Sequence, residues 1–131
     1  MVQSEVAHRL AAKPDNKDYG SPTVKANWWS SLHLAGSVGR SVFWPVPNVD
    51  SSLVRFDRHA PIGSEAERVK TFKVIDHAFA KRRKMMRSAI SEIFGGSSVA
   101  ESALIRAGID PTIRGEALTV AQFAQIAQQI S

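Results

Sequence analysis

Apolar positions along the chain follow two different rhythms, and the change falls near residue 60. In residues 3–12, Val6, Leu10 and several alanines recur at helical spacing until Pro14 ends the pattern. A polar loop with several turn-forming residues follows. We therefore expect a short amphipathic helix near the start of the chain.

The next apolar residues predict one more helix and two strands. Val24, Trp28 and Leu32 stand four apart, which is the spacing of one face of a helix. Residues 32–38 are a candidate strand. Residues 52–56 are a clearer one, because polar and apolar side chains alternate there as in a half-buried strand.

Beyond residue 60 the apolar pattern is helical throughout. The segment RHAPIGSE resembles a linker, and Ser64 with Glu67 forms a capping box for the helix that follows it. A further helix is expected over residues 97–107, and a second capping box, Thr119 with Gln122, begins the last one. After the linker, Phe72, Ile75 and Phe79 recur three and four residues apart, and Met86, Ile90 and Ile93 continue that spacing seven residues after Phe79.

These patterns predict an α+β chain, with a mixed α/β part over residues 1–60 and an all-helical domain over residues 61–131. The front part supplies only two helices and two strands, and a two-stranded hairpin is marginal in water. Its apolar faces therefore need a partner. Our hypothesis is that residues 1–60 are the tail of a larger α/β domain whose beginning is not in this chain.

The composition of the chain excludes several kinds of site and segment. The chain of 131 residues has no cysteine, which excludes disulfides and thiolate metal sites and fits a reducing cytoplasm. No run of eighteen apolar residues predicts a membrane span, and the first ten residues lack the apolar core of a signal peptide. The four histidines have no metal-ligand spacing, so we expect no metal site.

Positive charge is concentrated in one segment. The formal net charge is +5, and between Arg68 and Arg87 eight Lys or Arg residues face a single acid, Asp76. Such a patch attracts polyanions by counterion release and long-range steering. The competing interpretation is a solvated helix face, which suits most basic runs.

Two arginines in the sequence KRRKMMR, residues 81–87, interrupt an apolar stripe. Continuing the helical spacing from Phe79 places Arg82 and Arg83 at core positions, and the stripe resumes only at Met86. Unpaired arginines are costly to bury. Either the helix breaks there and restarts, or the arginines face a groove with an anionic partner such as a phosphate backbone.

The stretch SVFWPVPNVD, residues 41–50, combines aromatic and cyclic residues. Pro45 and Pro47 fix their own φ angles and push the residues before them toward extended conformations. The expected result is a stiff loop that bears Phe43 and Trp44. These rings either stack on nucleobases or plug a core, and physical reasoning alone favours the core.

Four segments in order resemble one family. FWPVPNVDS (43–51) resembles the F-x-P-x-P-x-V-D-S element of the rRNA adenine dimethyltransferases of the KsgA type, and FAKRRKMMR (79–87) is similar to their F-x-x-R-R-K-x-[LM]-R element. AGIDPTIRGEALTVAQFAQIA (107–127) is similar to their ending, G-I-D-P-x-x-R-x-E-x-L-[ST]-x-x-Q-[FY]. MVQSEVAHRLAAKPDNKDYG (1–20) is similar to an M-[LV]-Q-x-E-V-x-x-R-L segment and the loop after it.

The resemblance implies a fold and an activity. The family has a Rossmann-like methyltransferase domain followed by a small helical domain. Residues 1–60 would then be the C-terminal part of the first, and residues 61–131 the helical rRNA-binding domain. The family transfers methyl groups from S-adenosyl-L-methionine to N6 of two adjacent adenines of small-subunit rRNA. The implied partner is small-subunit rRNA or a 30S-type ribosomal particle in the cytoplasm, with no membrane and no metal.

The resemblance also assigns residues. The aromatic of the F-x-P-x-P loop lies beside the target adenine in the family, and that position here is Phe43. Trp44 stands at a variable position and keeps the core interpretation. The implied phosphate contacts are Arg82, Arg83, Lys84, Arg87 and, less directly, Arg114.

The chain departs from the family at two points. The glycine-rich cofactor loop, the acid that holds the cofactor ribose and the N-L-P-Y catalytic element all precede the matched region. We therefore expect this polypeptide alone neither to bind S-adenosyl-L-methionine nor to methylate RNA. Gly115 stands where the family more often has a helix-compatible residue, which predicts a more flexible loop before the last helix.

Two other functions remain open at this point. A non-catalytic RNA-binding module could use the basic patch alone. A DNA-binding helix-turn-helix is disfavoured, because its recognition helix would be VAQFAQIAQQI, which has no Lys or Arg.

Overall fold

The structure is a computed structural model that describes residues 2–42, 44–46 and 50–130. The chain divides into two compact units, Met1–Ala60 and Pro61–Ser131, which we call the N-terminal and the C-terminal unit. Each has its own buried residues and is described separately.

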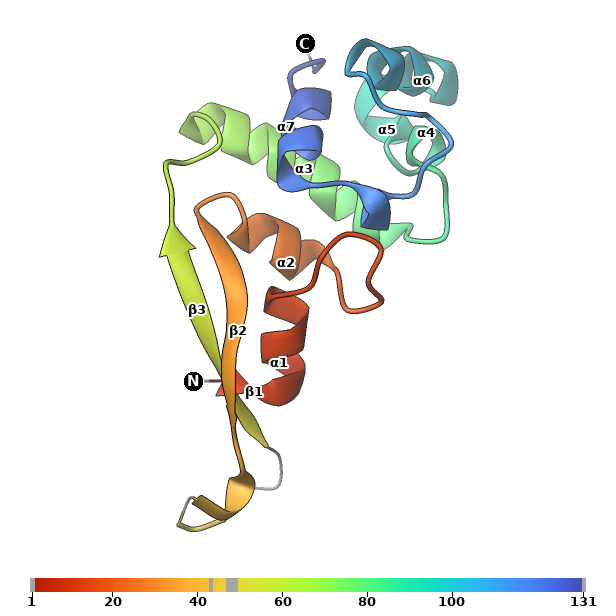
Figure 1. Ribbon diagram of the computed structural model, residues 1–131. Coiled ribbons are helices and arrows are strands. Elements are labelled where there is room, and N and C mark those ends of the chain that lie inside the picture. The colour runs from red at the N-terminus through yellow and green to blue at the C-terminus, as the bar shows by residue number, and fades with distance from the viewer. Residues whose placement is uncertain (1, 43, 47–49, 131) are drawn as a thin grey trace. The chain divides into compact units, whose positions relative to one another are not determined.

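The N-terminal unit contains a three-stranded antiparallel sheet in the order β1-β3-β2 (Figure 1). Its strands are β1 (Val2–Gln3), β2 (Ser30–Val38) and β3 (Ser51–Arg58). Both predicted strands are present and longer than expected, whereas the prediction of only two strands is wrong. β1 is too short to show alternation in the sequence, and it forms because its backbone pairs with β3.

Two helices pack beside this sheet, α1 (Ser4–Leu10) and α2 (Ser21–Ala26). The predicted helix through Val24, Trp28 and Leu32 is wrong as one element. α2 ends at Ala26, and β2 pairs with β3 from Ser30 onward. All three apolar residues are nevertheless buried, one on the helix, one in the turn and one on the strand, because pairing with a distant strand outweighs local helical spacing.

The core of the N-terminal unit lies between these helices and one end of the sheet. Ala7, Tyr19, Val24, Trp28 and Leu32 are all at most 3% exposed, and burial raises the pKa of the Tyr19 hydroxyl to about 12. The rest of the sheet is open. The exposed fraction is 48% for Leu34, 42% for Leu53 and 57% for Phe56.

The segment between β2 and β3 begins with a short 3₁₀ turn, η1 (Arg40–Val42). Phe43 lies outside the described residues, so its predicted position is not tested. Trp44 is 95% exposed, and the expectation that it plugs a core is wrong. Trp44 belongs to the segment between the end of β2 at Val38 and the start of β3 at Ser51, not to the strands (Figure 1).

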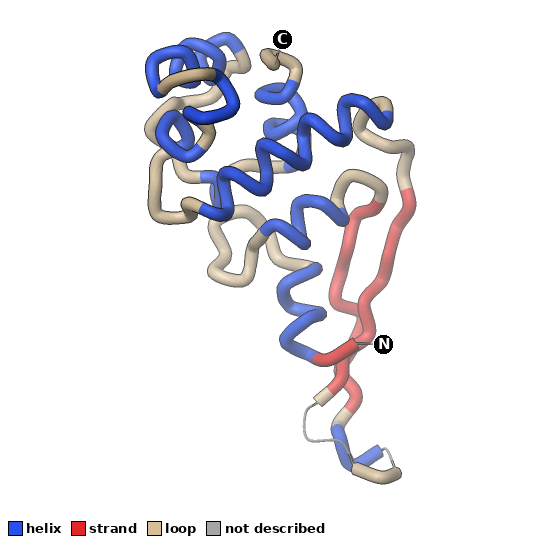
Figure 2. The backbone as a smooth tube through the Cα atoms, turned by 180° about the vertical axis from the view of Figure 1, so that it is seen from behind, coloured by secondary structure: helices blue, strands red, loops and turns tan. Residues whose placement is uncertain are grey.

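The C-terminal unit is helical, as predicted (Figure 2). Both expected capping boxes are present, at Ser64 with Glu67 and at Thr119 with Gln122. Its elements are α3 (Glu65–Ala80), α4 (Met86–Ala89), α5 (Ser91–Phe94), α6 (Ser97–Arg106), η2 (Gly115–Ala117) and α7 (Val120–Ala127).

α3 and α7 form the centre of this unit. Ile75 is fully buried on α3, and the rings of Phe79 and Phe123 lie 6.1 Å apart across the two helices. Phe72 and Phe79 are only half-buried, because the buried face of α3 is centred on Thr71, Val74, Ile75 and Ala78 rather than on the phenylalanines.

Gly115 is a point of close approach and not a loosened loop. It is buried in η2, and a Cβ built on it would lie 2.9 Å from Cβ of Ala78, 3.5 Å from Sδ of Met86 and 3.6 Å from the Phe123 ring. The glycine therefore lets η2 touch α3. This replaces the predicted flexibility with tight packing.

Candidate nucleic-acid interface

The basic run of residues 81–87 is a helix break. α3 ends at Ala80, Lys81 takes a non-helical conformation, and its N–H still bonds to the carbonyl of His77. A turn closed by the Lys84 N–H on the Lys81 carbonyl at 2.9 Å leads to α4, which begins at Met86. Of the two explanations left open by the sequence, the break is the one observed.

The GIDP segment forms a second turn. Gly108 takes φ +77° after α6, donates to the Ile105 carbonyl at 3.0 Å, and the next N–H, of Ile109, donates to the Leu104 carbonyl at 2.9 Å. This pair of bonds is a Schellman motif, and it needs a residue that tolerates a left-handed backbone. Ile109 is then 5% exposed and anchors the turn.

Asp110 closes this turn with its side chain. Its Oδ1 accepts hydrogen bonds from the Thr112 backbone N–H at 2.9 Å and from the Thr112 hydroxyl at 2.7 Å. These bonds, the backbone one first, hold the pKa of the Asp110 carboxyl below its usual range. The acid of the GIDP segment therefore acts on the backbone and shapes the turn.

Backbone hydrogen bonds join the two turns. The Met86 N–H donates to the Ile113 carbonyl at 2.7 Å, and the Arg87 N–H donates to the Pro111 carbonyl at 3.3 Å. Two sequence motifs that lie more than twenty residues apart thus run side by side. We call residues 81–87 and 110–116 together the basic corner.

Two arginines of the basic corner are paired with carboxylates. Arg82 Nε lies 3.3 Å from Glu116 Oε2, and its guanidinium lies 5.8 Å from the centre of the Phe79 ring. Arg87 Nη1 lies 3.5 Å from Glu101 Oε2 on α6. Both pairs are partly exposed, so each holds its arginine in place for at most ~1 kcal/mol.

Three other cations of the corner extend into solvent. Arg83, Lys84 and Arg114 are exposed, and within the described residues their side chains have neither an ion pair nor a hydrogen bond. An arginine fork or an ammonium group in this state is available to a phosphate without first breaking a pair. The structure thus places all five predicted basic residues in the basic corner. Arg82 and Arg87 are paired there, whereas Arg83, Lys84 and Arg114 are available to a phosphate.

The glutamates that pair with these arginines were missed from the sequence. Glu116 is the acid of the R-x-E ending and stands 34 residues from Arg82, while Glu101 lies within α6. The fixed R-x-E spacing was the available signal for Glu116. Glu101 had none, since only the packing of α6 on α4 brings it to Arg87.

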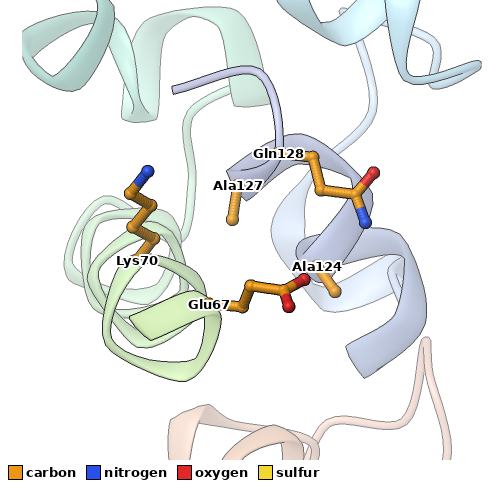
Figure 3. A pocket seen from close by; sticks show the side chains of 5 residues that line it. All are labelled: Glu67, Lys70, Ala124, Ala127 and Gln128. Carbon is orange, nitrogen blue, oxygen red and sulfur yellow. The ribbon is translucent and has the colours of Figure 1, made fainter. Parts of the chain in front are cut away.

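The hollow described in the C-terminal unit is too small to enclose S-adenosyl-L-methionine. A hollow of about 60 Å³ lies between α3 and α7, lined by Glu67, Lys70, Ala124, Ala127 and Gln128 (Figure 3). A site that encloses a ligand of that size needs at least about 300 Å³. Over the same residues, no cluster of three metal-ligating acids or histidines occurs, and no helix combines the length and apolarity of a bilayer span.

The chain is similar to known proteins along its whole length. The family model described as ribosomal RNA adenine dimethylase matches residues 1–131. A Streptomyces griseus subsp. griseus protein named ribosomal RNA small subunit methyltransferase A is 57% identical over 129 residues, covering 98% of this chain and 44% of that protein. Its namesake from Streptomyces coelicolor is 54% identical, covering 98% and 45%. This chain therefore spans less than half the length of these relatives.

Two solved structures share the α+β fold. A dimethyladenosine transferase from Plasmodium falciparum superposes with a TM-score of 0.76 at 16% identity, over 95% of this chain and 53% of that one. The 23S rRNA methyltransferase ErmE gives 0.64 at 21% identity, over 98% and 52%. The resemblance found in four sequence motifs is confirmed: the chain belongs to the ribosomal RNA adenine dimethylase family.

Proposed function

We propose that this chain is the C-terminal part of an S-adenosyl-L-methionine-dependent rRNA (adenine-N6,N6-)dimethyltransferase acting on small-subunit rRNA. Its role is to hold rRNA and to present the Phe43 loop to the target base. The carrying observation is the basic corner, where two motifs of the family meet and leave Arg83, Lys84 and Arg114 free to contact phosphates. In the cell the partner is a 30S-type ribosomal particle in the cytoplasm.

The N-terminal unit supports an interpretation as the terminal piece of a Rossmann-like sheet. β1 pairs with β3 in the register Val2 with Ser52, antiparallel. Residues placed before Val2 in a longer chain would continue along the free edge of β3 toward Arg58. The added sheet and helices would cover Leu34 and Phe56, which are open in this chain.

Phosphate binding would account for why some cations of the basic corner are paired with carboxylates and others are not. Arg82 and Arg87 are held by Glu116 and Glu101, so they stiffen the corner and contribute charge in fixed positions. The unpaired cations reach outward and supply most of the counterion release on RNA binding. Phe43 belongs to this proposal through the family motif alone.

A cofactor titration tests the proposal. We expect isothermal titration to detect no binding of S-adenosyl-L-methionine to the 131-residue chain, because these residues contain no glycine-rich cofactor loop of the kind the family uses. A version extended upstream to the length of the relatives should bind the cofactor and transfer methyl groups to adenine N6 of small-subunit rRNA. Tight binding by the short chain, or none by the extended one, would contradict the proposal.

A non-catalytic RNA-binding module is the second candidate. The exposed cations of the basic corner suit it equally well, since phosphate contacts do not require a cofactor. Binding of rRNA by the extended version, measured with and without cofactor, separates the two candidates. A module without a catalytic parent would show the same salt dependence in both cases.

A further inference from the structure

A row of basic side chains runs along one face of α3, mostly outside the basic corner. Lys70, Lys73 and His77 follow one another at intervals of three and four residues, which keeps them on one side of α3, and Lys81 comes four residues later, directly after the helix. At 1.5 Å per residue the row is about 16 Å long. Lys81 is also the first residue of the basic corner, so the two features are continuous.

The first two lysines of the row are free. Lys70 and Lys73 are exposed, and neither side chain has an ion pair or hydrogen bond with another described residue. In the close-up Lys70 leaves α3 on one side of the hollow, while Glu67 extends the other way, toward Gln128 (Figure 3). The Lys70 charge still acts on the Glu67 carboxylate, whose pKa is held below its usual range first by hydrogen bonds with Ser64 and to a smaller extent by Lys70.

A glutamate on α5 occupies the other end of the row. Glu92 is 70% exposed, and its carboxylate lies 3.5 Å from Lys81 Nζ and 3.9 Å from His77 Nε2. This carboxylate sits where a phosphate oxygen would sit if an anion bridged the same two side chains. It therefore competes with any polyanion that follows the row.

We propose that the row is a second contact for the rRNA backbone, in which the strand held at the basic corner continues along α3 past Lys73 to Lys70. The inference rests on the proposed function, since it names a further binding surface for the same RNA. A nucleic-acid strand carries one negative charge at each nucleotide, so it matches a linear series of cations better than a compact anion would. The contact is to phosphates and adds affinity without reading sequence.

Removing the free lysines tests this track. Lys70→Gln with Lys73→Gln should weaken binding of the 131-residue chain to small-subunit rRNA. The plot of log K against log salt should become shallower by about 1.4, because about 0.7 is lost per contact to a single strand. The matched control is Lys13→Gln with Arg106→Gln, which removes the same charge from exposed positions on the loop after α1 and on α6. The control should retain the original slope.

Glu92→Gln provides a test of opposite sign. Freeing Lys81 and His77 from the carboxylate should tighten RNA binding and steepen the salt slope by roughly 0.7. Circular dichroism of all variants checks that the helices are retained.

The results separate this inference from the proposed function. If the Lys70 and Lys73 variant behaves like its control while Arg83→Ala weakens binding, the α3 track is wrong and the basic corner stands. If Arg83→Ala also leaves binding unchanged, both proposals fall. Weaker binding of the Glu92→Gln variant would likewise overturn the track.

Discussion

An arginine can bind a phosphate with its whole guanidinium only if that group is not already paired with another side chain. Arg82 is committed twice, to the Glu116 carboxylate and to the face of Phe79, whereas Arg83, its neighbour in the chain, projects freely. Adjacent and chemically identical residues therefore have different duties. Under the proposed function, Arg82 orders the corner and adds charge to it, whereas Arg83 serves phosphate binding alone.

Alanine substitution of the two arginines should expose this difference. Both Arg82→Ala and Arg83→Ala should weaken rRNA binding and reduce the salt slope by roughly 0.7–0.9. Only Arg82→Ala should also lower the free energy of unfolding, by up to ~1 kcal/mol, because it loses the partly exposed pair with Glu116. Filter binding measures the affinity for rRNA, and thermal unfolding measures the stability. Equal stability of the two variants would refute the structural role assigned to Arg82.

The division of the arginines could not be predicted from the sequence. The basic run itself was visible, and so was the choice between a helix break and a groove. Which arginine pairs with which acid depends on Glu116, 34 residues away from Arg82, and on the packing of α6. Local patterns contain no information on such contacts.

Elements whose boundaries are set by residues close in sequence were predicted correctly. The capping boxes at Ser64 and Thr119 begin α3 and α7 because donor and acceptor stand three residues apart. The segment around Trp28 was mistaken for helix because its alternative, pairing of β2 with β3, joins residues that are distant in the chain, such as Ser30 with Arg58. Burial of Val24, Trp28 and Leu32 was predicted correctly although the element was not.

The contact between η2 and α3 gives an element-level prediction. Gly115→Ala should lower the free energy of unfolding by about 1–3 kcal/mol, since the new methyl group meets Ala78 Cβ, which the α3 backbone holds in place. Chemical denaturation followed by circular dichroism measures the change. Gly39→Ala is the control, because the nearest atom to its new methyl group is a serine hydroxyl 3.9 Å away, and it should be nearly neutral.

For the whole molecule, the two units differ in how complete their cores are. The C-terminal unit fully buries several large apolar residues, including Leu118, Phe123 and Ile126. The N-terminal unit leaves part of its sheet open, where Leu34 and Phe56 are exposed on the same face as the buried Leu32. The sequence indicated this imbalance, since two helices and two strands were too few for an independent sheet domain.

Dye binding can test whether a longer chain covers this sheet. The 131-residue chain should enhance the fluorescence of the hydrophobic dye ANS, and the upstream-extended version should enhance it less per molecule, because added strands and helices bury the exposed residues. Phe56→Asn in the short chain should reduce the signal in the same direction. Undiminished fluorescence of the extended version would show that upstream residues do not cover Leu34 and Phe56.

The bonds from Met86 to Ile113 and from Arg87 to Pro111 have a consequence for how this surface can evolve. These hydrogen bonds use main-chain groups, which almost every amino acid supplies. The position of the basic corner therefore does not depend on which side chains it carries. Lineages can then add or delete charges at Arg83, Lys84 or Arg114 to suit a changed ligand without having to change the backbone contacts that support them.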